Sequence, residues 1–182
     1  MKHSMFGRRS FLLSLPAVGA STAGCFPSVG KLTVLRQAAP NPLAGVKSYA
    51  LAPVTWDGFT YDGVPEAVWL ATRTPEQQAS FANDKVEATQ KLLERLQAEA
   101  VAGETFTKGS SSSGFVLAYN VRSYADGNFA WDLVIKDADG TPVDELSGPP
   151  TGEGMWGFAP QFNYFIVVAG MLTVEYLRER YA

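Results

Sequence analysis

The chain has 182 residues and a formal net charge of −3 at pH 7, and this acidic balance argues against nucleic acid as a partner. Its one cysteine, Cys25, excludes an intramolecular disulfide. Its one histidine, His3, stands in a segment that we expect to be removed, which excludes Ser-His and Cys-His nucleophile pairs and histidine-based metal sites from the mature protein.

Residues 1–24 have the layout of an export signal. Arg8 and Arg9 precede an apolar run from Phe11 to Ala20, and small residues follow up to Cys25. The run holds about ten residues and contains Pro16, whereas a membrane-spanning helix needs about 20 mostly apolar residues. The pattern therefore favours a signal over an uncleaved anchor or a core helix.

Cys25 is the predicted lipidation site. T-A-G-C at 22–25 resembles a lipobox, and R-R-S-F-L from Arg8 resembles the twin-arginine export motif. Cleavage before Cys25 removes 24 of 182 residues and leaves 158, with 12 basic and 18 acidic residues and a formal charge of −6. Phe26, rather than aspartate, follows the cysteine, and the resemblance to Gram-negative lipoproteins then implies the outer membrane.

Residues 25–45 are predicted to be the lipidated cysteine and a flexible tether, since they contain several prolines and little periodicity. Lys31–Leu35 could add a short strand to this region. Residues 46–182 are predicted to form one globular domain, and its first strand is expected at Val46–Val54, where apolar and polar residues alternate.

The segment from Trp56 to Gly63 repeats an aromatic residue and an Asp-Gly pair. Asp-Gly is a strong turn signal, so the segment is interpreted as two turns or a small hairpin. The alternatives are an aromatic ligand platform and a cation loop around Asp57 and Asp62.

A long helix is predicted from Thr74 to Gly103. Thr74 can cap the helix, Pro75 suits the first position, and Gln77 stands where a capping-box partner belongs. A single apolar stripe predicts packing across a sheet, with a partner helix as the alternative. The stripe consists of Ala82, Val86, Thr89, Leu93, Leu96 and Ala100.

The second half of the chain predicts an antiparallel meander and a closing helix. A serine-rich loop at 109–114 precedes three strands at Phe115–Ser123, Phe129–Lys136 and Pro142–Leu146, and Asp137 and Asp139 are interpreted as turn formers. The helix is predicted at Pro160–Tyr181, too short in its apolar part to span a bilayer. The fold class expected is thus α+β, a two-layer sandwich of about four mostly antiparallel strands with two helices on one face.

G-E-G-M-W-G from Gly152 matches a dinucleotide-binding motif literally. That motif needs a preceding strand and a complete βαβ unit, for which no room remains, so nucleotide binding and cofactors are not expected. Ser147–Ala159 is interpreted as a loop that presents Met155, Trp156 and Phe158.

The combined pattern resembles small bacterial envelope lipoproteins with a fold like that of the TolB amino-terminal domain and the curli-secretion lipoprotein. The features that carry it are the lipobox, K-S-Y-A-L-A-P, F-V-L-A-Y-N-V and K-D-A-D-G-T-P-V. The resemblance implies a periplasm-facing accessory or assembly protein with no known active site, anchored to the membrane through Cys25.

Two functions are therefore expected. The first is a non-catalytic envelope lipoprotein that docks a protein partner, with no metal site. The second is a glycan- or peptidoglycan-binding module or a carboxylate-only glycosidase, for which the acidic pairs are Asp57 with Asp62, Asp137 with Asp139, and Asp144 with Glu145. Aromatic residues are enriched in binding hot spots, and the expected partner-binding residues are Trp56, Phe59, Tyr61, Met155, Trp156 and Phe158.

Overall fold

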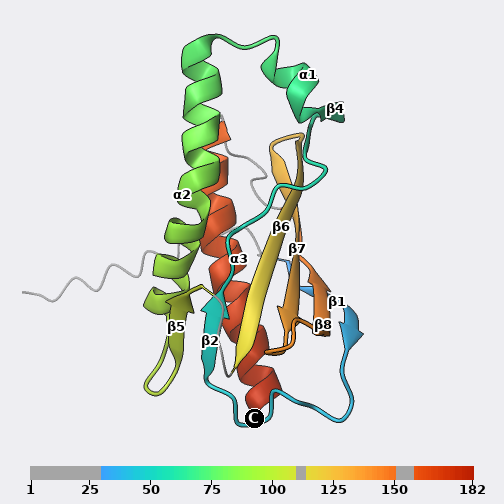
Figure 1. Ribbon diagram of the computed structural model, residues 1–182, viewed down its shortest axis with the longest axis vertical. Helices are drawn as coiled ribbons and strands as arrows, with labels where there is room; N and C mark the ends of the chain where they lie inside the picture. The colour runs from blue at the N-terminus through green and yellow to red at the C-terminus, as the bar shows by residue number, and fades with distance from the viewer. Residues whose placement is uncertain (1–29, 110–113, 151–157) are drawn as a thin grey trace, which may run out of the picture.

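The computed structural model describes residues 30–109, 114–150 and 158–182. The export signal, Cys25, Met155 and Trp156 lie outside these ranges. Within them, one mixed sheet of eight strands is accompanied by three helices. The two long helices, α2 (Pro75–Glu99) and α3 (Phe158–Tyr181), run side by side along the same face of the sheet (Figure 1).

The sheet is only partly antiparallel. The order β1-β8-β7-β6 is antiparallel throughout, whereas β2 lies parallel between β6 and β5. The short strand β3 pairs in parallel with the C-terminal end of β6 and antiparallel with β4. The strands are β1 (Thr33–Gln37), β2 (Ser48–Leu51), β3 (Thr60–Tyr61), β4 (Val64–Pro65), β5 (Thr105–Lys108), β6 (Phe115–Ala125), β7 (Asn128–Lys136) and β8 (Pro142–Ser147).

The prediction of about four strands and two helices is therefore wrong in number, and three of the strand pairings are parallel. The α+β class is confirmed, and so is the β6–β7–β8 meander. The additional strands have two to five residues and pair with neighbours in the sheet. β1 overlaps the short strand considered at Lys31–Leu35, and β3 with β4 forms a small hairpin beginning in the Trp56–Gly63 segment. The third helix, α1 (Glu66–Leu70), has only five residues, too few to show a helical period.

The central strand β7 shows why the alternating apolar pattern predicted the strands correctly in this region. Its burial alternates along its whole length, with Phe129, Trp131, Leu133 and Ile135 fully buried. Residues of one face of a strand share a side of the sheet, so this row packs towards α3. At the end of β7, the Asp137 carboxylate accepts hydrogen bonds from the backbone N–H groups of Asp139 and Thr141, which makes it a turn former.

Helix α2 begins as predicted, but its buried face is rotated in the first half. The Thr74–Gln77 capping box is present, with Pro75 at the first position. Leu93 and Leu96 are buried, as expected. Val86 is 79% exposed and Ala82 is exposed, and the buried side chains are instead Phe81, Ala88, Thr89, Leu92, Leu93 and Leu96.

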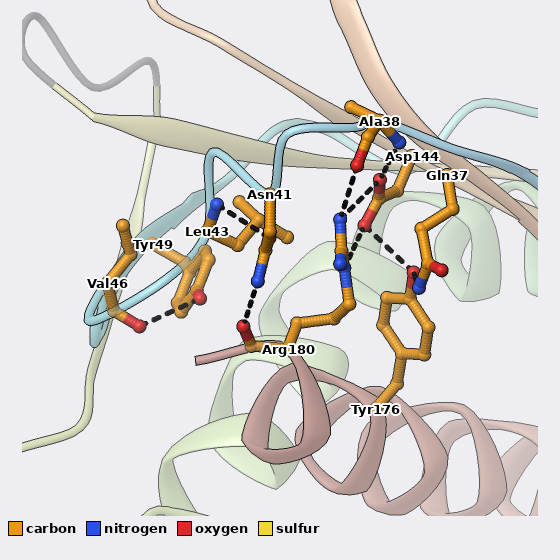
Figure 2. Close-up of polar contacts among 9 residues, drawn as sticks. All are labelled: Gln37, Ala38, Asn41, Leu43, Val46, Tyr49, Asp144, Tyr176 and Arg180. Carbon is orange, nitrogen blue, oxygen red and sulfur yellow. Dashed lines mark hydrogen bonds and ion pairs between the residues drawn. The ribbon is translucent and has the colours of Figure 1, made fainter. Parts of the chain in front are cut away.

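Residues 30–45 are not a free tether in the structure. β1 pairs with β8, and Leu43 is completely buried. The Asn41 amide donates to the carbonyl of Arg180, and its carbonyl oxygen accepts from the N–H of Leu43 (Figure 2). The predicted domain boundary at residue 46 is therefore too late, because this segment contributes a strand and a core side chain.

Figure 2 shows how a buried carboxylate joins three distant parts of the chain. Asp144 on β8 accepts hydrogen bonds from Arg180 Nε at 2.9 Å, from Tyr176 Oη at 2.8 Å and from the backbone N–H of Ala38 at 2.9 Å. Asp144 is fully buried and Arg180 is 11% exposed at the side chain. We call this group the Asp144 latch, since it fixes the last turns of α3 to β8 and to the residues after β1.

None of the helices in the described ranges is long and apolar enough to cross a membrane.

Candidate functional site

A cluster of aromatic rings gathers around Phe81 of α2. Its ring lies 5.9 Å from that of Trp56, 5.6 Å from Phe59, 5.0 Å from Trp69 and 5.6 Å from Phe158. These residues come from the segment after β2, from α1, and from the first residue of α3. Such edge-to-face and tilted pairs stabilise a core beyond the area that they bury.

The cluster corrects part of the binding-site prediction. Trp56 is 8% exposed and Phe59 is 3% exposed, so neither presents a free face to a partner. Both were predicted to be partner-binding residues. They are buried because β3 and the Thr55–Asn120 bridge bring the segment against β6, which places both rings next to Phe81.

Tyr61 and Phe158 remain partly exposed, and they line a surface pocket of about 230 Å³. We call it the aromatic pocket. It is lined by residues of β3, α1, the N-terminal half of α2 and the first residue of α3. α1 and the N-terminal end of α2 lie at the top of the view in Figure 1. The walls of the pocket are formed by Tyr61, Trp69, Arg73, Gln77, Ser80, Phe81, Asp84 and Phe158.

Helix geometry explains one wall of the pocket. Gln77, Ser80, Phe81 and Asp84 are separated by three or four residues along α2, so they share one face of the helix. The opposite wall is the Trp69 indole, which stacks on Tyr61 at 4.2 Å with an interplanar angle of 7°. The backbone thus places an aromatic floor below a rim of polar side chains.

The two charged residues of the pocket have no strong partners. The Arg73 guanidinium lies 5.3 Å above the Trp69 ring, and burial raises the pKa of the Asp84 carboxyl. Neither side chain has a hydrogen bond or ion pair with another described residue. Lys85 binds Glu66 at 2.8 Å and Lys91 binds Glu87 at 3.0 Å. The Lys91 charge still lowers the pKa of Asp84, but less than burial raises it.

The Trp56 and Trp69 indole N–H groups are buried without an acceptor among the described residues. A buried donor left unpaired costs about 1–3 kcal/mol. The same holds for the Trp131 indole N–H in the core between β7 and α3, so this feature is not particular to the aromatic cluster.

None of the acidic pairs considered for carboxylate chemistry lines the aromatic pocket, and several of their members have structural roles. Asp144 belongs to the buried latch, its neighbour Glu145 binds Arg36 at the surface, and Asp137 forms a turn. Asp62 adopts a positive φ of 48°, as its turn position predicts. In residues 30–109, 114–150 and 158–182, no group of three or more acidic, histidine or cysteine residues could hold a metal ion.

A second pocket of about 180 Å³ lies between β1 and α3. Glu175 and Glu179 line it together with Lys31 and Tyr176. It borders the edge strand and lacks the ring cluster, so we regard the aromatic pocket as the better candidate site.

Six of the eight pocket residues were not predicted as site residues, namely Trp69, Arg73, Gln77, Ser80, Phe81 and Asp84. Phe81 and Asp84 fell outside the predicted stripe of the helix. A signal was present, since four of the aromatic residues in the cluster occur between positions 56 and 69 and a fifth follows at 81. Only their convergence in space shows that they form one site.

Comparison with known proteins gives no family for this chain. No family model and no curated protein matches it. Among solved structures it is similar to PelC dodecamers from Paraburkholderia phytofirmans, with 18% and 16% identity, 78% of this chain and 95% or 96% of the other covered, and a TM-score of 0.44 in both cases. It is also similar to a Xanthomonas campestris protein of DUF330, with 14% identity, 79% and 90% coverage, and a TM-score of 0.38. These TM-scores and identities are too low to carry an argument about function.

Proposed function

We propose that this protein is an exported, lipid-anchored envelope protein without catalytic activity, and that it docks a protein partner at the aromatic pocket. The proposal combines the export signal and Cys25 with the site described above. The observation that carries it is the pocket itself, because aromatic side chains meet polar ones there at the surface.

The size of the pocket favours a docking role over a catalytic or cofactor role. Pockets for small molecules measure about 300–1,000 Å³, and this one measures about 230 Å³. It suits one inserted side chain of a partner, which is how binding hot spots are usually built. It also contains a single carboxylate, Asp84, whereas a glycosidase uses a pair.

The glycan-binding alternative has less support from the geometry. Tyr61 stacks on Trp69 and also contacts Tyr124 at 4.9 Å. Arg73 lies over the Trp69 ring. The rings that would form a flat platform for a sugar are therefore engaged with each other and with a cation.

The docking role is tested by site-specific photocrosslinking in the host envelope. A photoreactive residue replaces Ser80 in the pocket, and the matched control replaces Ala98, an exposed residue near the other end of the same helix. We expect a discrete crosslinked protein from position 80 and none from position 98. Equal crosslinking from both positions, or from neither, would contradict the proposal.

The anchor is tested at Cys25. Cys25→Ser should abolish labelling by a palmitate analogue and release the protein from membranes, while the melting temperature of the domain stays unchanged. If the unlabelled variant still fractionates with membranes, the lipid-anchor part of the proposal is wrong.

A further inference from the structure

We infer that the aromatic pocket selects its partner by charge, and that it takes a protein segment with an apolar side chain between a basic and an acidic residue. This inference rests on the proposed function and names the chemistry of the partner.

The two charges stand at different ends of the pocket. Arg73 precedes the N-cap of α2, whereas Asp84 lies in its third turn. From Gln77 to Asp84 the helix rises by about 10 Å at 1.5 Å per residue. Ser80 and Phe81 lie between them and carry no charge. The pocket thus has a positive end, an apolar middle and a negative end.

Neither charge forms an ion pair with another described residue. Burial raises the pKa of the Asp84 carboxyl most, Lys91 lowers it only from a distance, and Glu87 raises it. Lys91 binds Glu87, and Lys85 binds Glu66. Around Arg73, the contact found is with the Trp69 ring, which leaves its guanidinium donors open. Asp84 is partly buried and has no direct ion-pair partner among the described residues, so an incoming cation can form a close pair there that solvent screens less.

The required ligand follows from this arrangement. A basic side chain next to Asp84 and an acidic one next to Arg73 satisfy both charges, and the side chain between them enters the space above Phe81. In an extended segment, two residues four positions apart span about 13–14 Å. This exceeds the helical rise of about 10 Å from Gln77 to Asp84, and Arg73 lies four residues before Gln77, so such a spacing places one charged side chain towards each end of the pocket.

The experiment uses the full chain in detergent and a synthetic blocked peptide, Gly-Lys-Ala-Phe-Ala-Glu-Gly. Two control peptides replace either the lysine or the glutamate by glutamine. Fluorescence anisotropy measures Kd for wild type, Asp84→Asn, Arg73→Gln and the blocking variant Ser80→Trp.

Wild type should bind the parent peptide about three- to tenfold more tightly than either control peptide, in line with a partly screened ion pair. Asp84→Asn should lose only the preference for lysine, and Arg73→Gln only the preference for glutamate. Ser80→Trp should prevent binding of all three peptides. Because burial disfavours the Asp84 charge, Asp84→Asn should also keep or raise the melting temperature, which separates a binding role from a structural one.

The inference is overturned if wild type does not bind the parent peptide or if the two variants leave both preferences intact. If position 80 crosslinks a protein but the three peptides bind equally well, the docking function is supported and the selection by charge is refuted. Charge-selective peptide binding without a crosslink would refute the docking function instead.

Discussion

At the scale of single residues, the strongest electrostatic feature is Glu104. Its carboxylate accepts hydrogen bonds from Arg178 Nε and Nη2, both at 2.9 Å, from the Tyr181 hydroxyl and from the backbone N–H of Val101. These bonds, the Arg178 bond first, lower the pKa of Glu104 to about 2, although burial opposes the shift. Its side chain is 3% exposed, so screening by water is weak.

The first stability prediction follows from this pKa. Because folding lowers it from 4.5, the ionised carboxylate stabilises the fold above pH 4.5, and that contribution is lost as the pH falls from 4.5 to about 2. Glu104→Gln should lower the free energy of unfolding at pH 7 by roughly 2 kcal/mol, with a discount for the partly exposed Arg178. Urea denaturation at several pH values measures this.

The control for Glu104 is Glu87→Gln, which removes the exposed ion pair with Lys91. It should change stability by less than about 0.5 kcal/mol at pH 7. Wild type and Glu104→Gln should become equally stable near pH 2. A constant difference across the whole pH range would show that the loss is one of packing rather than of charge.

At the scale of elements, α2 serves two purposes along one helix. Its second half packs Leu92, Leu93 and Leu96 into the core. Its first half directs Phe81 into the ring cluster and leaves Gln77, Ser80 and Asp84 at the pocket. The buried face of α2 is rotated about the helix axis between the two halves. The single apolar stripe predicted from the sequence therefore described only the second half correctly.

The element-scale prediction compares two apolar residues of α2 that the sequence analysis placed on the same buried face. Leu96 is completely buried, and Leu96→Ala should cost about 2–5 kcal/mol in the free energy of unfolding. Val86 is 79% exposed, and Val86→Ala should stay within about 0.5 kcal/mol of wild type. Denaturant unfolding of both variants measures the contrast. Equal losses would contradict the rotated face of α2.

At the scale of the whole molecule, the Asp144 latch closes the fold. It joins the segment after β1, the strand β8 and the last turns of α3. Ala38 lies 106 residues before Asp144 and 142 before Arg180, while Asp144 and Arg180 are 36 residues apart. The latch binds the last turns of α3 (Figure 2), whereas the aromatic pocket includes Phe158 at the first residue of the same helix, so the latch can hold α3 against the sheet without entering the site. The buried Tyr176 hydroxyl takes part, and burial together with Asp144 raises its pKa to about 12.

The whole-molecule prediction removes one partner of the latch. Arg180→Met leaves the Asp144 charge buried and uncompensated, which should cost about 3–5 kcal/mol. The matched control is Arg36→Met. Arg36 binds Glu145, the neighbour of Asp144, and the two side chains are 55% and 37% exposed. Removing this exposed pair should lower the free energy of unfolding by about 0–1 kcal/mol. Calorimetric melting distinguishes them. Similar losses would mean that burial does not set the strength of these pairs.

What the sequence determined by itself is local. The Thr74–Gln77 capping box, the alternation in β7 and the Asp137 turn depend on neighbours within a few residues, and each is present in the structure. Three features depend on contacts between distant segments. They are the burial of Trp56 and Phe59, the parallel pairing of β2 with β5 and β6, and the aromatic pocket. Burial is a property of the neighbour across the sheet or helix, and only the tertiary structure supplies that neighbour.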